Sequence, residues 1–336
     1  MKKLLITGVH GFVGSNLVNT LKAENEIYGL DIINSQKDGV IRTFSWDDMS
    51  NDILQEVDAI IHLAGKAHDT KSFGKLRDQQ SEEYFKVNTE LTKKIYDYFL
   101  AHEAIKKFIF FSSVKAAADR VDGILTEDVV PSPVGPYGES KIAAEEYIKS
   151  ASTLLASLRW QASKARARHA PGPSDKQTYI LRPCMIHGPG NKGNLNLLYG
   201  VVKKGIPWPL GAFENKRTFT SIDNLCYIIH ELLTKDIESG VYNINDDEAV
   251  STNELIEIIC SALGKKARIW HIPRGLMKGI AKVGGWLHLP LNPERLQKLT
   301  ENYVSSNAKI KKALGIEQLP VRAKDGLMKT IRSFDK

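Results

Sequence analysis

Short apolar runs alternate with longer amphipathic ones along the first half of the chain, and this alternation constrains the fold more than any other feature. The short runs are nearly continuous in hydrophobic side chains, as in strands buried on both faces of a parallel sheet. The predicted strands are Lys3–Thr7, Glu26–Asp31, Asp58–Leu63, Lys107–Phe111 and Thr178–Leu181, and the predicted helices between them are Gly11–Lys22, Glu82–Ala101 and Tyr137–Lys149. This order predicts an α/β fold with a doubly wound parallel sheet.

The composition and the apolar patterning of the sequence change after Pro183. Gly, Pro and Asn cluster at 187–194, strands become short, and helices are predicted at 222–234 and 252–263. A chain of 336 residues is longer than one hydrophobic core usually holds. We therefore predict a larger domain over residues 1–182 and a smaller C-terminal α/β domain over residues 183–336.

Residues 151–177 stand apart as a basic segment with a Pro-Gly-Pro, placed where a short loop normally joins a helix to a strand. This segment is either a basic arm for an anionic partner or a flexible, solvated insertion, and its composition favours the insertion. The whole chain carries a net charge of +7, which fits a diphosphate substrate or nucleic acid but also simple solubility.

The three cysteines, Cys184, Cys226 and Cys260, are far apart and lack any metal-binding spacing. Buried reduced thiols, no metal site and a reducing, cytoplasmic compartment are therefore expected. No run of about 18 apolar residues occurs, so no membrane span is predicted. The apolar stretch from Ile280 to Leu291 is broken by charge, glycine and proline. It could touch a membrane surface, but a packed amphipathic segment is the preferred prediction.

The first predicted strand runs directly into glycines with the spacing G-x-x-G-x-x-G. Gly8 permits a tight turn, Gly11 lets the backbone approach a pyrophosphate, and Gly14 lets the following helix pack closely on the strand. The free N–H groups of this helix N-terminus, at Phe12 and Val13, would face the phosphates. The arrangement predicts a dinucleotide site.

Asp31 ends the second predicted strand, 17 residues after Gly14. A carboxylate there accepts hydrogen bonds from the adenosine ribose and repels a 2′-phosphate. The nearest following cation is Lys37. The sequence therefore favours NAD over NADP; the alternative is that Asp31 only shapes the turn at the strand end.

A hydroxyl-bearing strand end and a helix with Tyr-x-x-x-Lys form the predicted catalytic group. Ser112 and Ser113 follow the apolar run at Phe111, and Tyr137 and Lys141 share one helix face. A nearby ammonium and the positive nicotinamide would lower the pKa of the Tyr137 phenol. Tyr137 could then exchange a proton with a hydroxyl while hydride leaves or reaches the same carbon, and Ser113 would orient the reacting oxygen.

In this order the motifs resemble those of the extended short-chain dehydrogenase/reductases, which include NAD-dependent nucleotide-sugar epimerases, dehydratases and 4-ketoreductases. The resemblance runs from residue 3 to about residue 260 apart from 151–177, and it implies a Rossmann sheet. By this resemblance the cofactor also contacts Leu63, Ala64, Gly65, Asn88, Ser112, Tyr137, Lys141 and Pro183.

Segments of the second half resemble the substrate sites of UDP-sugar enzymes. Asn194-Leu195 and Arg217 resemble diphosphate contacts, the Pro-Trp-Pro segment containing Pro209 resembles the one beside uracil, and Arg295 is a second candidate for phosphate. Arg295 is equally well explained as a solvated cation. Lys66, His68 and Lys115 are candidates for the sugar pocket, with solvated loop residues as the even alternative.

The residues after Ser113 bear on the reaction type. Dehydratases of the family carry an Asp-Glu pair where this chain has Val114 and Lys115, so dehydration is disfavoured. Epimerases usually show Tyr-Gly where Ala117 and Ala118 stand, and the region resembles reductases of UDP-4-keto-6-deoxy-N-acetylhexosamines that serve surface-polysaccharide synthesis.

Three hypotheses remain at this point. The first is hydride transfer at C4 of a UDP-sugar, by epimerisation or ketone reduction. The second is an NAD(P)-dependent dehydrogenase of a non-nucleotide alcohol, and the third is a non-catalytic nucleotide-sensing or RNA-binding relative; the intact catalytic group argues against the third. The resemblance also implies a homodimer formed through the helices of Glu82–Ala101 and Tyr137–Lys149.

Overall fold

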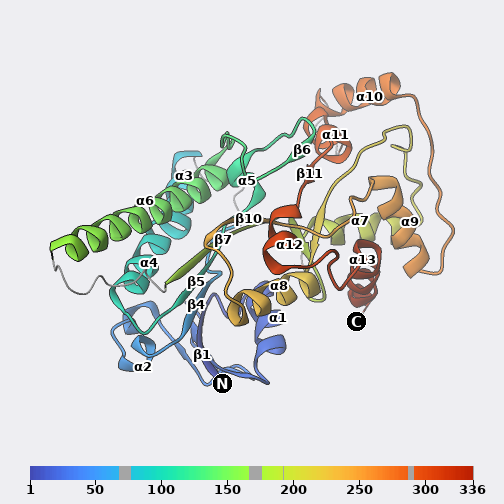
Figure 1. Cartoon of the computed structure of the whole chain (residues 1–336). Coiled ribbons are helices and arrows are strands. Elements are labelled where there is room, and N and C mark those ends of the chain that lie inside the picture. Colours follow the sequence, from blue (N-terminus) through green and yellow to red (C-terminus); the bar gives the residue numbers. More distant parts are fainter. Residues whose placement is uncertain (68–76, 166–175, 192, 287–290, 336) are drawn as a thin grey trace. The chain divides into compact units, whose positions relative to one another are not determined.

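The computed structural model describes residues 1–67, 77–165, 176–191, 193–286 and 291–335 (Figure 1). The chain forms two compact units that interleave along the sequence. The sheet unit contains Met1–Asp119, Glu127–Pro183 and Ile228–Asn243, and the second unit contains Arg120–Thr126, Cys184–Tyr227 and Ile244–Lys336. A functional division at residue 182 stays a prediction.

A seven-stranded sheet forms the centre of the sheet unit, in the order β10-β7-β5-β4-β1-β2-β3. The chain starts in the middle at β1, winds outward through β2 and β3, and then returns to wind outward in the other direction. The predicted doubly wound parallel fold is confirmed. The strands are β1 (Lys2–Thr7), β2 (Asn25–Leu30), β3 (Arg42–Phe44), β4 (Ala59–His62), β5 (Lys107–Phe111), β7 (Gln177–Pro183) and β10 (Gly240–Ile244).

Helices cover the two faces of this sheet. Figure 1 shows α4 and α6 on the side of the strands opposite α1, and a core of buried residues joins α4 and α6 to the sheet. The helices that lie wholly in the sheet unit are α1 (Phe12–Leu21), α2 (Asp52–Gln55), α3 (Arg77–Tyr84), α4 (Leu91–Ala101), α5 (Val114–Ala117) and α6 (Pro136–Ala165), with η1 (Trp46–Asp48) and the π-helical η2 (Phe85–Glu90).

Two helices differ from their predicted form. The predicted helix Glu82–Ala101 is interrupted by one π-helical stretch, η2. The predicted helix Tyr137–Lys149 is too short, because α6 continues to Ala165. The N-terminal part of the segment 151–177 is thus helical, and residues 166–175 lie outside the described ranges.

The register of the parallel strands brings two chain segments together at one edge of the sheet. Thr7 at the end of β1 pairs with His62 at the end of β4, so the turns that follow both strands leave the sheet side by side. The sheet reverses its direction of winding between these two strands. In doubly wound sheets, ligands bind at the carboxyl ends of the strands at this switch point.

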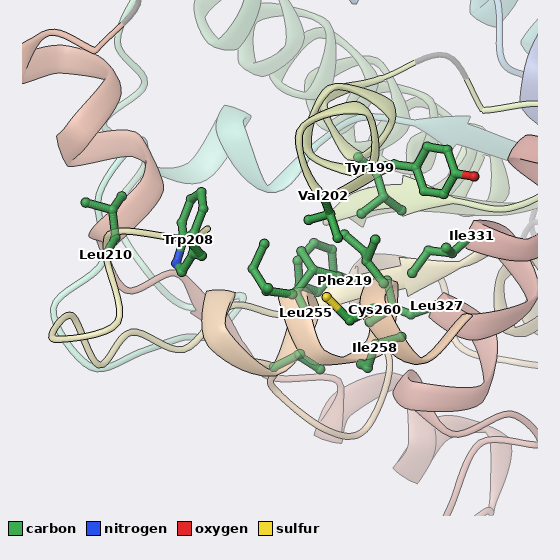
Figure 2. Packing of buried hydrophobic residues seen from close by; sticks show 14 of the residues in the cluster. Tyr199, Val202, Trp208, Leu210, Phe219, Leu255, Ile258, Cys260, Leu327 and Ile331 are labelled. Carbon is green, nitrogen blue, oxygen red and sulfur yellow. The ribbon is translucent and has the colours of Figure 1, made fainter. Parts of the chain in front are cut away.

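The second unit is assembled around its own apolar core, which Figure 2 shows with Trp208, Phe219 and Cys260 among its members. Its elements are β6 (Ile124–Leu125), β8 (Met185–His187), α7 (Asn194–Lys203), β9 (Phe219–Ser221), α9 (Thr252–Ala262), α10 (Arg274–Trp286), α11 (Pro293–Thr300), β11 (Val304–Ser305), α12 (Ala308–Leu314), α13 (Ala323–Arg332) and η3 (Ser333–Asp335). Helix α8 (Ile222–Thr234) contributes to both units, and it matches the predicted 222–234.

The three cysteines are buried and free, as predicted. In the described part of the chain, no helix combines the length and the apolar character needed to cross a bilayer.

Candidate active site

The glycine turn after β1 is as tight as its spacing predicts. Gly8 has a φ of +69°, a left-handed conformation that favours glycine. A Cβ added to Gly8 would lie 3.0 Å from the backbone nitrogen of Ala64. A Cβ on Gly14 would lie 2.4 Å from the carbonyl oxygen of Gly8 and 2.8 Å from the Cα of Val9. The turn therefore presents bare backbone beside the N-terminus of α1, which is what a pyrophosphate requires.

Gly14→Ala is expected to weaken NAD binding by at least about tenfold and to destabilise the fold by about 1–3 kcal/mol. The new methyl group would meet backbone atoms, which cannot move without opening the turn. Titration with NAD and chemical unfolding measure the two effects. Gly279→Ala in α10 is the matched control, since nothing lies within 4 Å of its added Cβ. Unchanged NAD affinity in Gly14→Ala would contradict the assignment of this turn.

Asp31 follows β2 and is largely buried. Its carboxylate accepts hydrogen bonds from the backbone N–H groups of His10 (3.0 Å) and Ile32 (2.7 Å). Asp31 thus stabilises the glycine turn as well as its own strand end. Lys37 donates to the Ser15 hydroxyl at 2.9 Å. Recognition of a ribose by Asp31 stays a prediction.

The loop after β4 is held against the glycine turn by a buried polar group. The Thr7 hydroxyl accepts hydrogen bonds from the N–H groups of Leu63 (3.1 Å) and Ala64 (3.0 Å), and its oxygen lies 2.7 Å from Nδ1 of His62. Nε2 of His62 lies 3.0 Å from the Thr92 hydroxyl. Burial lowers the pKa of His62 to about 3, so this histidine is neutral and supports the loop.

Asn88 lies within the π-helical stretch η2 and is fully buried. Its side-chain oxygen accepts from the Lys66 N–H at 2.7 Å, and its amide donates to the Lys66 carbonyl and to the Ser140 hydroxyl, both at 3.0 Å. Asn88 therefore ties the loop after β4 to helix α6. A π-helical stretch inside a helix frequently marks a functional position.

The Ser113 hydroxyl lies close enough to the Tyr137 phenol to influence its pKa. Ser113 caps α5 and accepts from the Lys115 N–H at 3.2 Å, and the Tyr137 ring lies edge-on to Tyr84 with centroids 6.1 Å apart. Burial raises the pKa of Tyr137, while the neighbouring Ser113 hydroxyl opposes that rise. Among the protein groups the direction is set by desolvation, which outweighs the neighbouring hydroxyl. The lowering expected from Lys141 together with a bound nicotinamide stays a prediction.

Lys141 is 5% exposed and lies one helical turn after Tyr137 in α6. Its ammonium donates to the Phe111 carbonyl at 2.8 Å and lies 5.1 Å from the Phe110 ring centre. An added Cβ at Gly65 would lie 3.0 Å from this ammonium, so Lys141 also borders the loop after β4. Burial lowers the pKa of Lys141 to about 8.

A buried ion pair fastens α6 to the strand ends. Arg182 in β7 donates to both carboxylate oxygens of Glu145 in α6, at 2.9 and 2.7 Å, and neither side chain is more than 2% exposed. The Ser112 hydroxyl donates to the same carboxylate at 2.6 Å. We did not identify Glu145 from the sequence; its place one turn after Lys141 on the same helix was the only sign.

The two lysines predicted to line a sugar pocket are paired with carboxylates. Lys66 forms an ion pair with Glu83 and lies over the Tyr84 ring. Lys115 pairs with Asp119 at 3.0 Å. A substrate contact by either lysine stays a prediction, and His68 lies outside the described residues.

The remaining predicted substrate residues lie in the second unit. Arg217 donates to the Lys298 carbonyl at 2.7 Å and is thereby held beside α11, the helix that carries Arg295. Leu195 is buried in the core of this unit. Its side chain packs against apolar neighbours, so any contact with substrate would be made by its backbone. Asn194 begins α7, and Pro209 follows the buried Trp208. These five assignments stay predictions.

Comparison with known proteins supplies an independent finding. A family model described as NAD dependent epimerase/dehydratase family matches residues 4–245. A UDP-glucose 4-epimerase from Vibrio cholerae is 30% identical over 293 residues, covering 81% of this chain and 78% of that protein. An N-acetyl-alpha-D-glucosaminyl-diphospho-ditrans,octacis-undecaprenol 4-epimerase from Escherichia coli O157:H7 is 26% identical over 318 residues, covering 92% and 84%.

A solved structure has a similar fold. The UDP-glucuronic acid 4-epimerase from Bacillus cereus, in complex with NAD, superposes with a TM-score of 0.70 at 20% identity, covering 99% of this chain and 98% of that one. At this identity the likeness speaks for the fold alone.

Proposed function

Since the chain belongs to the NAD dependent epimerase/dehydratase family, we propose that it transfers hydride at C4 of a UDP-hexose or UDP-N-acetylhexosamine. Family membership bears out the prediction of an NAD-dependent enzyme. The observation that carries the proposal is the proximity of the Ser113 hydroxyl to Tyr137, which lies one turn from the buried ammonium of Lys141 on helix α6. The sheet unit contains the glycine turn, the loop after β4 and the predicted catalytic residues.

Bound NAD would supply the hydride acceptor, held by the glycine turn and the Thr7-supported loop. Tyr137 accepts the proton of the sugar 4-hydroxyl in one direction and returns it to the 4-oxygen in the other. Ser113 hydrogen-bonds the same oxygen and orients it. The Lys141 ammonium lowers the cost of forming a phenolate, and the Phe111 carbonyl holds that ammonium in place.

The rate of ketone reduction is expected to be constant through neutral pH and to fall above about pH 8. Reduction needs a protonated Tyr137 and a charged Lys141. The raised pKa of Tyr137 keeps its proton on the phenol, whereas the ammonium of Lys141, with a pKa of about 8, loses its charge as the pH rises past that value. A steady-state pH profile measures this. A rate that stays flat until the protein unfolds at alkaline pH would argue against a role for Lys141.

Product analysis with one equivalent of cofactor separates the two reactions open at C4. An epimerase keeps its NAD and gives a 4-epimer with no net change in nicotinamide absorbance. A reductase acting on a 4-keto sugar consumes NADH stoichiometrically. The positions of Val114 and Lys115 lack the acidic pair that dehydration needs, so no water is expected to be lost from the sugar.

A second candidate substrate is a sugar linked to a polyprenyl diphosphate. The relative from Escherichia coli that bears this activity in its name covers 92% of the chain. Arg217 is hydrogen-bonded to α11, the helix that carries Arg295, and both guanidinium groups suit a diphosphate whether it carries uridine or a lipid. Assays with both substrate types, read by nuclear magnetic resonance, decide between them.

Protection against heat unfolding tests the remaining alternative. A UDP-sugar enzyme is stabilised by UDP, because any ligand of the native state raises the unfolding temperature. The absence of such a shift, together with turnover of a non-nucleotide alcohol, would favour the dehydrogenase hypothesis.

The homodimer through α4 and α6, the cytoplasmic location and the role in surface-polysaccharide synthesis stay predictions. Light scattering tests the homodimer.

A further inference from the structure

Helix α10 (Arg274–Trp286) presents three distinct faces. Met277, Ala281 and Gly284, at helical spacing, are buried, and the first two belong to the core of the second unit. The packed amphipathic segment predicted from Ile280 to Leu291 is thus confirmed for one face of α10, and residues 287–290 lie outside the described ranges. The other two faces are exposed, and they differ from each other in chemistry.

The second face is apolar and exposed. Leu276, Ile280, Val283 and Trp286 are spaced four, three and three residues apart, so their side chains follow one side of the helix. Their exposed fractions are 57%, 45%, 55% and 79%. Single exposed apolar residues are ordinary on proteins, but a row of four large ones marks an interaction surface.

The third face is basic. Arg274, Lys278 and Lys282 are exposed, again four residues apart, and the helix contains no acidic residue. Lys282 lies four residues before Trp286, so the basic row borders the apolar one. The chain as a whole carries a net charge of +7.

We propose that α10 docks the protein on the surface of an anionic lipid bilayer. A helix with a cationic face beside a row of Trp, Leu, Ile and Val lies in the plane of a membrane surface, with the apolar row in the headgroup boundary and the cations on anionic lipid. At 13 residues α10 is too short to cross a bilayer. The mode of binding is peripheral and reversible.

Charge complementarity selects a lipid surface over a second copy of this chain. A symmetric dimer through this face would place the same patch on both partners. The basic row of one copy would then lie beside the basic row of the other, with no acidic side chain on α10 to compensate. An anionic membrane satisfies both exposed faces at once.

The proposal that α10 docks on a membrane does not depend on the reaction at C4. Docking would also place the enzyme beside a polyprenyl diphosphate in the same bilayer, and this part rests on the second candidate substrate of the proposed function. The experiment therefore measures lipid binding and turnover of a soluble UDP-sugar separately.

The test is co-sedimentation of the full chain with vesicles of phosphatidylcholine, with and without phosphatidylglycerol. We expect binding only to the vesicles that contain phosphatidylglycerol, weakening as salt is raised. Ile280→Glu and Val283→Glu are each expected to lower the partition coefficient by roughly tenfold. Ile53→Glu, at an exposed apolar position of α2 in the sheet unit, is the matched control and should bind as the wild type does.

The basic face is tested by Lys278→Glu combined with Lys282→Glu, against Lys312→Glu in α12 as control. Turnover of the UDP-sugar without vesicles should be the same in all these variants, so its loss would bear on the proposed function and not on docking. Absence of binding to phosphatidylglycerol vesicles overturns the proposal, as does equal binding by the α10 and control variants. A dimer that dissociates in Ile280→Glu, seen by light scattering, would assign the face to a second copy instead.

Discussion

Replacing Tyr137 with phenylalanine is expected to lower turnover by about a hundred- to ten-thousand-fold, with little effect on cofactor affinity. The change removes one hydroxyl, the group proposed to exchange the proton at the reacting oxygen. The ring remains, so its edge-on contact with Tyr84 is kept. Single-turnover kinetics with a UDP-sugar and NAD titration measure the two quantities.

The loss should come from chemistry and not from folding. The change removes a single hydroxyl, and losing one hydrogen bond of such a group costs only about 0.5–1.5 kcal/mol of stability. Tyr147→Phe is a matched control in the same helix. The Tyr147 hydroxyl donates a hydrogen bond of 2.5 Å to Asp97, which is not part of the catalytic group. Turnover by Tyr137→Phe within a few-fold of wild type would remove Tyr137 from the reaction.

Replacing Glu145 with alanine is expected to reduce the free energy of unfolding by about 3–5 kcal/mol. The carboxylate is fully buried and pairs with Arg182, so its removal leaves a buried guanidinium without a counter-charge. The Ser112 hydroxyl loses its acceptor at the same time. Chemical denaturation measures the change.

Glu146→Ala is the matched control, because the neighbouring side chain is exposed and its loss should change stability by less than about 0.5 kcal/mol. The double variant Glu145→Leu with Arg182→Met should be more stable than Glu145→Ala, since it removes both buried charges. If Glu145→Ala were as stable as the double variant, the ion pair between Glu145 and Arg182 would not be what holds α6 to β7.

The elements of the sheet unit could be predicted from the sequence more completely than those of the second unit. Continuous apolar runs mark β1, β5 and β7 because both faces of the sheet are covered, and the strand Lys107–Phe111 is confirmed to the residue. The short β3 and the helices after residue 270 escaped prediction. Their boundaries depend on packing within the second unit, which local periodicity does not encode.

The candidate site shows the same division. The order and spacing of the motifs pointed to the glycine turn, Ser113, Tyr137 and Lys141, whose roles stay predictions. They could not locate the pairing of Glu145 with Arg182, because an ion pair between residues 37 apart in sequence depends on the tertiary fold. They also did not reveal that burial raises the pKa of Tyr137 among the protein groups.

The most direct test of the central claim is to follow deuterium from C4 of a labelled UDP-N-acetylhexosamine incubated with the enzyme and NAD. If hydride is transferred at C4 with Tyr137 as proton carrier, the deuterium will be found either on the nicotinamide or back at C4 of the 4-epimer, and Tyr137→Phe will leave it largely in place. Release of the deuterium into water, or an unchanged sugar across hexose and N-acetylhexosamine substrates alike, would contradict the account.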